Sequence, residues 1–198
     1  QKNWMYENLW KNVDIKPSRI HYLNPWKPRG TLDEECVAFE EDILKAGGLD
    51  LVFFGTGADG HVGRNEPGSS FASPTRLTSL AYDTRIQLSS RWSTPLDSIP
   101  KTTLTMGIGT LFTSKLLLVL FTGVSRSRAL EMCLEFPVNH MYPVSYLQKH
   151  QHVVFAADDP ATMELRIKTV TYFRGIERTA EENFGDDKEG LIGYMENT

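Results

Sequence analysis

The chain has 198 residues, of which 40% are hydrophobic and 23% charged, enough for one domain with a core and unlike a disordered or fibrous protein. A formal net charge of −4 argues against nucleic acid as the main partner and leaves room for a local basic pocket that binds a small anion. The longest apolar run, residues 116–124, is too short to span a bilayer, so we expect no membrane partner. Cys36 and Cys133 lie far apart in no metal or redox motif, which predicts buried, reduced thiols and a cytoplasmic protein.

The first clear elements are a helix and a strand. Thr31 and Glu34 form a capping box, and apolar residues at helical spacing then continue to Gly47 and Gly48, which predicts a helix between these points. Residues 49–54 are a short, largely apolar run bounded by glycines, which predicts a buried strand.

Two further strands are expected, at residues 116–121 and 153–157. The first is followed by a helical segment at residues 125–134, whose inner side should carry Ala129, Met132 and Cys133. After the second, Asp158 and Pro160 provide a helix start, and apolar residues repeat until Gly175, which predicts a helix packed against a sheet.

Strands that alternate with helices predict an α/β fold: a doubly wound, mainly parallel, Rossmann-like sheet with helices on both faces. In such folds the sites form at the carboxyl ends of the strands, and the loop after residues 49–54 occupies such an end. We expect residues 1–198 to form a single domain, with a charged, solvated or flexible tail from about residue 177.

The loop from Gly55 to Ser70 allows two interpretations. Its first residues spell G-x-G-x-x-G after a strand, as in a dinucleotide-binding turn, and Asp83 lies where a ribose-binding acid would be expected. That interpretation needs a long helix directly after the glycines. Glycines and Pro67 interrupt the segment, so we disfavour it and expect no nucleotide cofactor.

The second interpretation is a proton-transfer site, because Asp59, His61 and Glu66 lie within eight residues on the same loop. A histidine titrates near neutrality, and neighbouring carboxylates can hold its tautomer, which suits it to moving a proton on and off a sugar oxygen. The alternative is that both carboxylates satisfy loop N–H groups and His61 is a turn residue facing solvent.

The segment D-G-H-V-G-R-N-E-P-G-S-S, residues 59–70, closely resembles the D-G-H-I-x-F-N-E-P segment of glucosamine-6-phosphate deaminases. Further similar stretches follow in unbroken order, at Thr75-Arg76, Asp83-Thr84-Arg85, residues 105–111, Gly123, residues 138–140 and residues 162–169. The resemblance implies a cytosolic, often hexameric α/β enzyme that converts glucosamine 6-phosphate and water to fructose 6-phosphate and ammonia, without metal or nucleotide.

The resemblance also assigns site residues. His61 matches the family's ring-opening acid/base, and Asp59 and Glu66 match the carboxylates that orient and tune it. Arg126 stands at the position of a phosphate-binding Lys, and its guanidinium could hold a phosphate bidentately. Arg91 is the nearest match to a second phosphate-binding Arg, although it lies one position out of register.

Two glycines and two polar residues complete the expected site. Gly55 and Gly57 would let the backbone approach the sugar closely, or would simply form a tight turn. Ser69 and Arg76 resemble residues with which some family members bind an allosteric N-acetylglucosamine 6-phosphate. Thr78 replaces the Lys that usually helps, which puts that regulation in doubt.

The sequence also departs from the family pattern. Upstream of Lys11 it has neither the T-G-G-T-P-like phosphate loop nor the Asp-Glu pair whose Asp removes the C2 proton, so we expect the chain to correspond to the last two thirds of the fold. Phe54 and Arg64 replace residues that are often Gly and Phe in the family. Three hypotheses stay open: a deaminase, a non-catalytic sugar-phosphate-binding or regulatory relative, and a lactonase-like enzyme of the wider superfamily.

Overall fold

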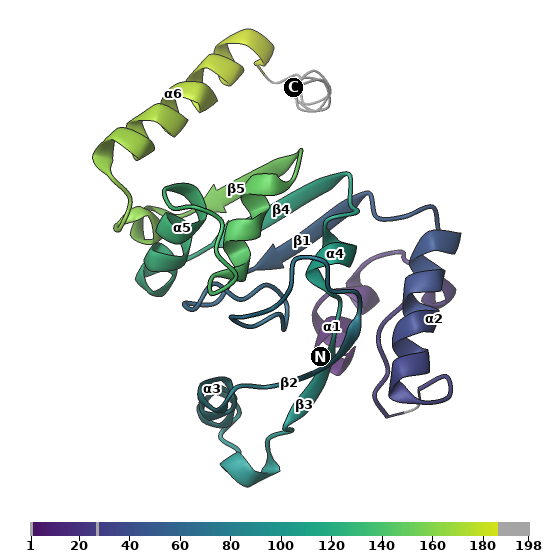
Figure 1. Ribbon diagram of the computed structural model, residues 1–198. Coiled ribbons are helices and arrows are strands. Elements are labelled where there is room, and N and C mark those ends of the chain that lie inside the picture. Colours follow the sequence, from purple (N-terminus) through teal and green to yellow (C-terminus); the bar gives the residue numbers. More distant parts are fainter. Residues whose placement is uncertain (1, 27, 186–198) are drawn as a thin grey trace.

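The structure, a computed structural model, describes residues 2–26 and 28–185, apart from the side chain of Phe184. Its centre is a parallel sheet of three strands in the order β1-β4-β5 (Figure 1), namely β1 (Leu51–Gly55), β4 (Leu116–Phe121) and β5 (Val153–Ala157). The expected parallel α/β sheet is therefore confirmed, and its three strands lie within one or two residues of the ranges expected from their apolar runs.

The helices and the short 3-10 segments are distributed along the whole described chain. The α-helices are α1 (Lys2–Asn8), α2 (Leu32–Lys45), α3 (Tyr82–Trp92), α4 (Ile108–Leu111), α5 (Ser127–Leu134) and α6 (Ile167–Phe184). The 3-10 segments are η1 (Trp10–Asn12), η2 (Pro17–Arg19), η3 (Leu96–Ser98), η4 (Val124–Arg126), η5 (Pro143–Lys149) and η6 (Asp159–Thr162).

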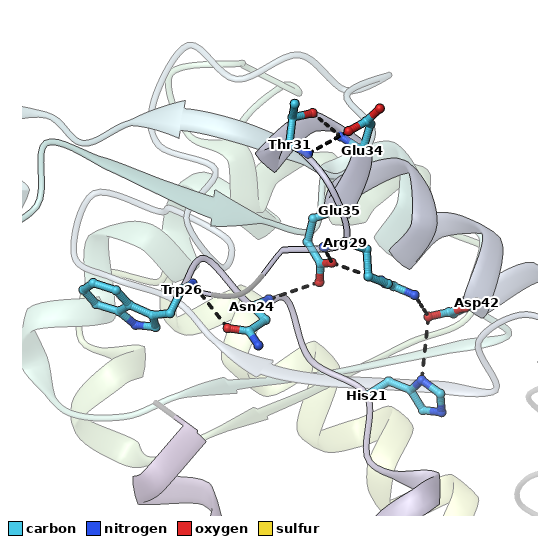
Figure 2. Close-up of polar contacts among 8 residues, drawn as sticks. All are labelled: His21, Asn24, Trp26, Arg29, Thr31, Glu34, Glu35 and Asp42. Atoms are coloured by element: carbon cyan, nitrogen blue, oxygen red, sulfur yellow. Dashed lines mark hydrogen bonds and ion pairs between the residues drawn. The ribbon is translucent and has the colours of Figure 1, made fainter.

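Helix α2 begins and ends as its sequence predicts. The Thr31 hydroxyl accepts from the Glu34 N–H and the Glu34 carboxylate accepts from the Thr31 N–H, which is the reciprocal capping box. A buried Glu35 on the same helix ties down the preceding segment, because its carboxylate accepts from the backbone N–H groups of Asn24 and Arg29 (Figure 2). The Arg29 guanidinium pairs with the same carboxylate, so burial of the Glu35 charge is compensated.

One face of the main sheet forms the core. Leu117, Val119 and Phe121 of β4 are fully buried there against α5 and η5. The expected inner residues of α5, Ala129, Met132 and Cys133, are all buried, which confirms the predicted helix and its orientation. Cys36 and Cys133 are both free and buried, as expected, and burial raises the pKa of the Cys133 thiol to about 12.

The opposite face of the sheet differs from the expectation that residues 49–54 form a buried strand and that helices cover both faces. Leu51 and Phe53 of β1 are 52% and 60% exposed, and Leu118, beside Phe53 in the parallel register, is partly exposed. Within the described chain β1 is an edge strand that pairs only with β4, but Leu118 lies on the central strand, so the edge position alone does not account for the exposure. No described helix covers this part of the outer face.

Helix α6 also differs from the expectation of one helix that starts at Asp158 and Pro160 and ends at Gly175 against the sheet. Residues after β5 first form η6, and α6 begins at Ile167 and continues through Gly175 to Phe184. It extends away from the sheet (Figure 1), and Ile167 is 86% exposed. Residues 177–184 of the expected charged tail thus continue this helix, and residues 186–198 lie outside the described residues.

A second sheet was not expected from the sequence. Strands β2 (Arg76–Ser79) and β3 (Thr102–Thr105) pair antiparallel, with Arg76 opposite Thr105. Helix α2 lies against β2, and Glu40 on α2 accepts hydrogen bonds from the Thr75 N–H and the Thr110 hydroxyl. Both strands are four residues long, too short to give a clear alternating pattern. No helix among the described residues is long and apolar enough to cross a membrane.

Candidate active site

The loop after β1 has no helix at the position that dinucleotide binding would require. Residues 56–75 run in turns and isolated bridges, and the next helix, α3, begins only at Tyr82. The N–H groups of a helix therefore do not face the Gly55–Gly60 turn from within this loop, which removes the dinucleotide interpretation.

The carboxyl end of β1 carries a carboxylate–imidazole pair. Oδ1 of Asp59 lies 2.7 Å from Nδ1 of His61 and also accepts from the His61 backbone N–H at 3.4 Å. Burial alone would raise the pKa of Asp59, but the hydrogen bond and the charge of His61 outweigh it and hold that pKa below its ordinary value. An ionised Asp59 can only accept, so the pair places the proton on Nδ1 and leaves Nε2 of a neutral ring as the basic nitrogen.

Gly57 makes this pair sterically possible. A Cβ on residue 57 would overlap the His61 ring and would approach Oδ1 of Asp59 to 2.6 Å. The sequence suggested that Gly55 and Gly57 admit a sugar; the structure shows that the space over Gly57 is occupied by the histidine ring. A Cβ on Gly55 would meet only Leu120 O, at 3.7 Å, an ordinary contact.

Glu66, expected to orient His61, lies on the same loop but is directed elsewhere. Its Oε2 accepts from the backbone N–H of Ala81, the residue that precedes α3, at 2.7 Å. Its Oε1 is buried without a hydrogen-bond partner among the described residues, and no hydrogen bond there joins Glu66 to His61. The structure therefore pairs Asp59 with His61 and links Glu66 to the start of α3, with Oε1 of Glu66 buried and without a described hydrogen-bond partner.

The two expected phosphate-binding arginines lie on different elements. Arg126 ends η4, directly after the Gly123 turn at the carboxyl end of β4, and donates to the Ser125 hydroxyl at 2.6 Å. Arg91 is exposed in the last turn of α3, which Figure 1 shows well separated from α5. Their joint contact with one phosphate stays a prediction that would require α3 to move.

The two expected effector-binding residues do lie together. The Arg76 guanidinium donates to the Ser69 hydroxyl at 3.4 Å and to Oδ1 of Asn65 at 2.7 Å. Burial lowers the pKa of Arg76, which still leaves it a cation at neutral pH. No described acidic side chain pairs with Arg76, so its charge remains available to an anion.

Three polar residues that support the loop were not recognised from the sequence. The Thr56 hydroxyl donates to the His61 carbonyl at 2.8 Å, the Thr105 hydroxyl accepts from the Arg64 N–H, and Asn65 is fully buried. Asn65 is the first residue of the N-E-P segment, directly before Glu66, so its position was a signal. Its role depends on contacts with residues up to 41 positions away, which spacing along the chain does not reveal.

Comparison with known proteins relates the chain to a family named for sugar-phosphate enzymes. The family model described as glucosamine-6-phosphate isomerases/6-phosphogluconolactonase matches residues 2–155. The glucosamine-6-phosphate deaminase of Drosophila pseudoobscura pseudoobscura is 43% identical over 179 residues, covering 90% of this chain and 65% of that protein. Human glucosamine-6-phosphate deaminase 2 is 42% identical over 174 residues, covering 88% and 62%. The chain thus spans just under two thirds of the length of these curated relatives.

Solved structures agree on the fold. A monomeric glucosamine-6-phosphate deaminase superposes with a TM-score of 0.76 at 35% identity, covering 81% of this chain and 66% of that one. A 6-phosphogluconolactonase from Thermotoga maritima superposes with a TM-score of 0.55 at 21% identity, covering 78% and 63%, a likeness that concerns the fold alone.

Proposed function

This chain belongs to the glucosamine-6-phosphate isomerase/6-phosphogluconolactonase family, and we propose that it serves the deaminase reaction. In that reaction glucosamine 6-phosphate and water give fructose 6-phosphate and ammonia, by aldose–ketose isomerisation with loss of the amino group. The observation that carries the proposal is the Asp59–His61 pair at the carboxyl end of β1. The deaminase relatives, at 42–43% identity, favour this reaction over lactone hydrolysis.

The pair suits the first chemical step, opening of the sugar ring. Nε2 of His61, unprotonated when Asp59 holds the proton on Nδ1, accepts the proton of the anomeric hydroxyl, and the resulting imidazolium returns a proton to the ring oxygen. Asp59 stabilises the imidazolium between these transfers because its carboxylate is ionised. Glu66 is the proposed second acceptor, and its buried Oε1 would have to turn toward the sugar to take that role.

The remaining proposals concern the phosphate, an effector, the cellular compartment and self-association. Arg126, with the η4 turn beside it, is the proposed phosphate ligand, and Arg91 would join it only after movement of α3. The paired Ser69 and Arg76 support an anionic effector, for which N-acetylglucosamine 6-phosphate is the candidate. The unpaired cysteines favour the cytoplasm, and the exposed Leu51 and Phe53 favour self-association.

Deamination also needs a base at C2, and the sequence has no match for the family's Asp-Glu pair upstream of Lys11. We therefore separate ring opening from ammonia release. General-base catalysis typically contributes about 10² to 10⁴ in rate. The 198-residue chain alone should open the ring yet release almost no ammonia.

The test is exchange NMR between the α and β anomers of glucosamine 6-phosphate, because anomers interconvert through the open chain. The purified chain should accelerate this exchange, His61→Gln should abolish the acceleration, and His140→Gln, which changes an exposed histidine, should retain it. No acceleration by the unmodified chain would rule out the proposed step. Ammonia release near that of full-length relatives would show that the C2 base comes from another residue or subunit.

A second candidate is a non-catalytic sugar-phosphate-binding relative, favoured by the unmatched C2 base and by Arg64 in place of the usual Phe. It predicts that titration with glucosamine 6-phosphate shifts the amide resonances near Arg126 while the anomers exchange at the uncatalysed rate. The same NMR samples therefore distinguish the two candidates.

A further inference from the structure

The two candidate proton-transfer residues, His61 and Glu66, flank a tight turn. Its ends are joined by reciprocal backbone bonds, from the Val62 N–H to the Asn65 carbonyl at 3.2 Å and from the Asn65 N–H to the Val62 carbonyl at 2.9 Å. Gly63 supplies the positive φ of +62° that the turn requires. The geometry of this turn therefore sets how His61 and Glu66 lie relative to each other.

The Asn65 side chain holds the turn from inside. It is fully buried, and its Nδ2 donates to the Val62 carbonyl within the turn and to the Met106 carbonyl just after β3, both at 2.9 Å. Its Oδ1 accepts from the Arg76 guanidinium at 2.7 Å. Both amide donors and one acceptor position are thus satisfied, which an isolated turn could not provide.

These contacts join the loop to both sheets. On one side, the Thr56 hydroxyl after β1 donates to the His61 carbonyl, and Val62 forms a bridge with Thr56 and packs into the main core. On the other side, Asn65 reaches Arg76 at the start of β2 and Met106 after β3. Arg76 also determines which way the amide points, because a flipped amide would direct an N–H group at the guanidinium and an oxygen at two carbonyls.

We propose that Asn65 is a positioning residue, locked in orientation by Arg76, that holds the His61 ring against Asp59 and the Glu66 carboxylate at the start of α3. The inference deepens the proposed function, since it concerns how the same site is held in place. Asn65 acts through its neighbours and touches no substrate. Its loss should therefore weaken the Asp59–His61 hydrogen bond and slow proton transfer, with binding of the sugar phosphate retained.

The direct test is NMR of the His61 ring and the Asp59 carboxylate in the 198-residue chain. The unmodified chain should show a low-field His61 Nδ1–H resonance and an Asp59 pKa below its ordinary value. Asn65→Asp keeps the size and the Arg76 partner but sets an oxygen against the Val62 and Met106 carbonyls, so it should lose the resonance and raise the Asp59 pKa. Arg76→Met should weaken the His61 resonance and raise the Asp59 pKa in the same way, but by less.

Ile99→Val is the matched control, because it trims a buried side chain that forms none of these contacts. It should lower the melting temperature and leave the His61 resonance unchanged. If Asn65→Asp and Arg76→Met lower the melting temperature but leave the His61 and Asp59 signals unchanged, the positioning role is wrong and Asn65 is only a structural residue.

A kinetic readout separates this inference from the proposed function. Where the unmodified chain accelerates anomer exchange, Asn65→Asp should slow the catalysed rate about 10- to 100-fold without changing the dissociation constant for glucosamine 6-phosphate. A change in affinity alone would contradict the inference. If the unmodified chain does not accelerate exchange, the proposed function fails, and the His61 resonance still decides whether Asn65 positions the pair.

Discussion

The two faces of the central sheet are made of similar apolar residues and have different surroundings. On one face Leu117, Val119 and Phe121 of β4 are fully buried. The loop that carries Asp59 and His61 is anchored to this core through Val62. On the other face Phe53 is 60% exposed. The candidate site is therefore supported by a buried core on one side, while the opposite side presents an apolar surface that α/β sheets usually cover.

The largest expected effect comes from comparing one residue type on the two faces. Phe121→Ala should destabilise the fold by about 3–5 kcal/mol, because it removes a fully buried ring and leaves a cavity. Phe53→Ala should cost less than about 1 kcal/mol, because the ring is already largely hydrated. Urea unfolding of both variants measures the difference. Equal losses would mean that the outer face is covered in solution.

A smaller effect is expected inside the site loop. Gly57→Ala should displace the His61 ring from Asp59 and slow anomer exchange about 10- to 100-fold, because the new Cβ would occupy the place of the ring. Gly175→Ala, in α6 at a position where a Cβ meets nothing within 4 Å, is its control. Similar exchange rates in the two variants would show that the ring does not need the space over Gly57.

The pH dependence of folding stability tests the ionisation of Asp59. The pKa of Asp59 in the folded chain lies below its ordinary value. Its carboxylate therefore stabilises the fold at pH values above the ordinary Asp pKa of about 3.9. This contribution disappears as the pH falls through the pKa of the folded state. The stability difference between the unmodified chain and Asp59→Asn should therefore shrink from pH 6 to pH 2. A difference that stayed constant with pH would indicate that Asp59 is not ionised in the pair.

The smallest effect concerns α6. Gly175 lies inside this helix and a Cβ there would meet no described atom, so Gly175→Ala should stabilise the helix by about 0.5–1 kcal/mol. Slower amide hydrogen exchange around residue 175 is the expected sign. Faster exchange would show that α6 packs closely against another surface in solution, and would weaken the contrast between the two faces.

Local sequence signals were sufficient to predict several elements. The capping box of α2, the apolar runs of β4 and β5, and the inner side of α5 were all predicted correctly, because each depends on neighbouring residues along one element. The order D-G-H also indicated the Asp59–His61 pair, because two side chains that are two positions apart on a glycine-rich turn lie close together in any fold of the chain.

Other features depend on contacts between residues that are far apart in the chain. Leu51 and Phe53 are as apolar as a buried strand requires, and their exposure depends on which elements cover that face of the sheet. Glu66 was expected beside His61, but the Val62–Asn65 turn carries it to the Ala81 N–H. Asn65 acquired its role through Arg76 and Met106, which the β2–β3 pairing brings to it. Burial and long-range hydrogen bonds depend on which elements meet, and residue spacing does not contain that information.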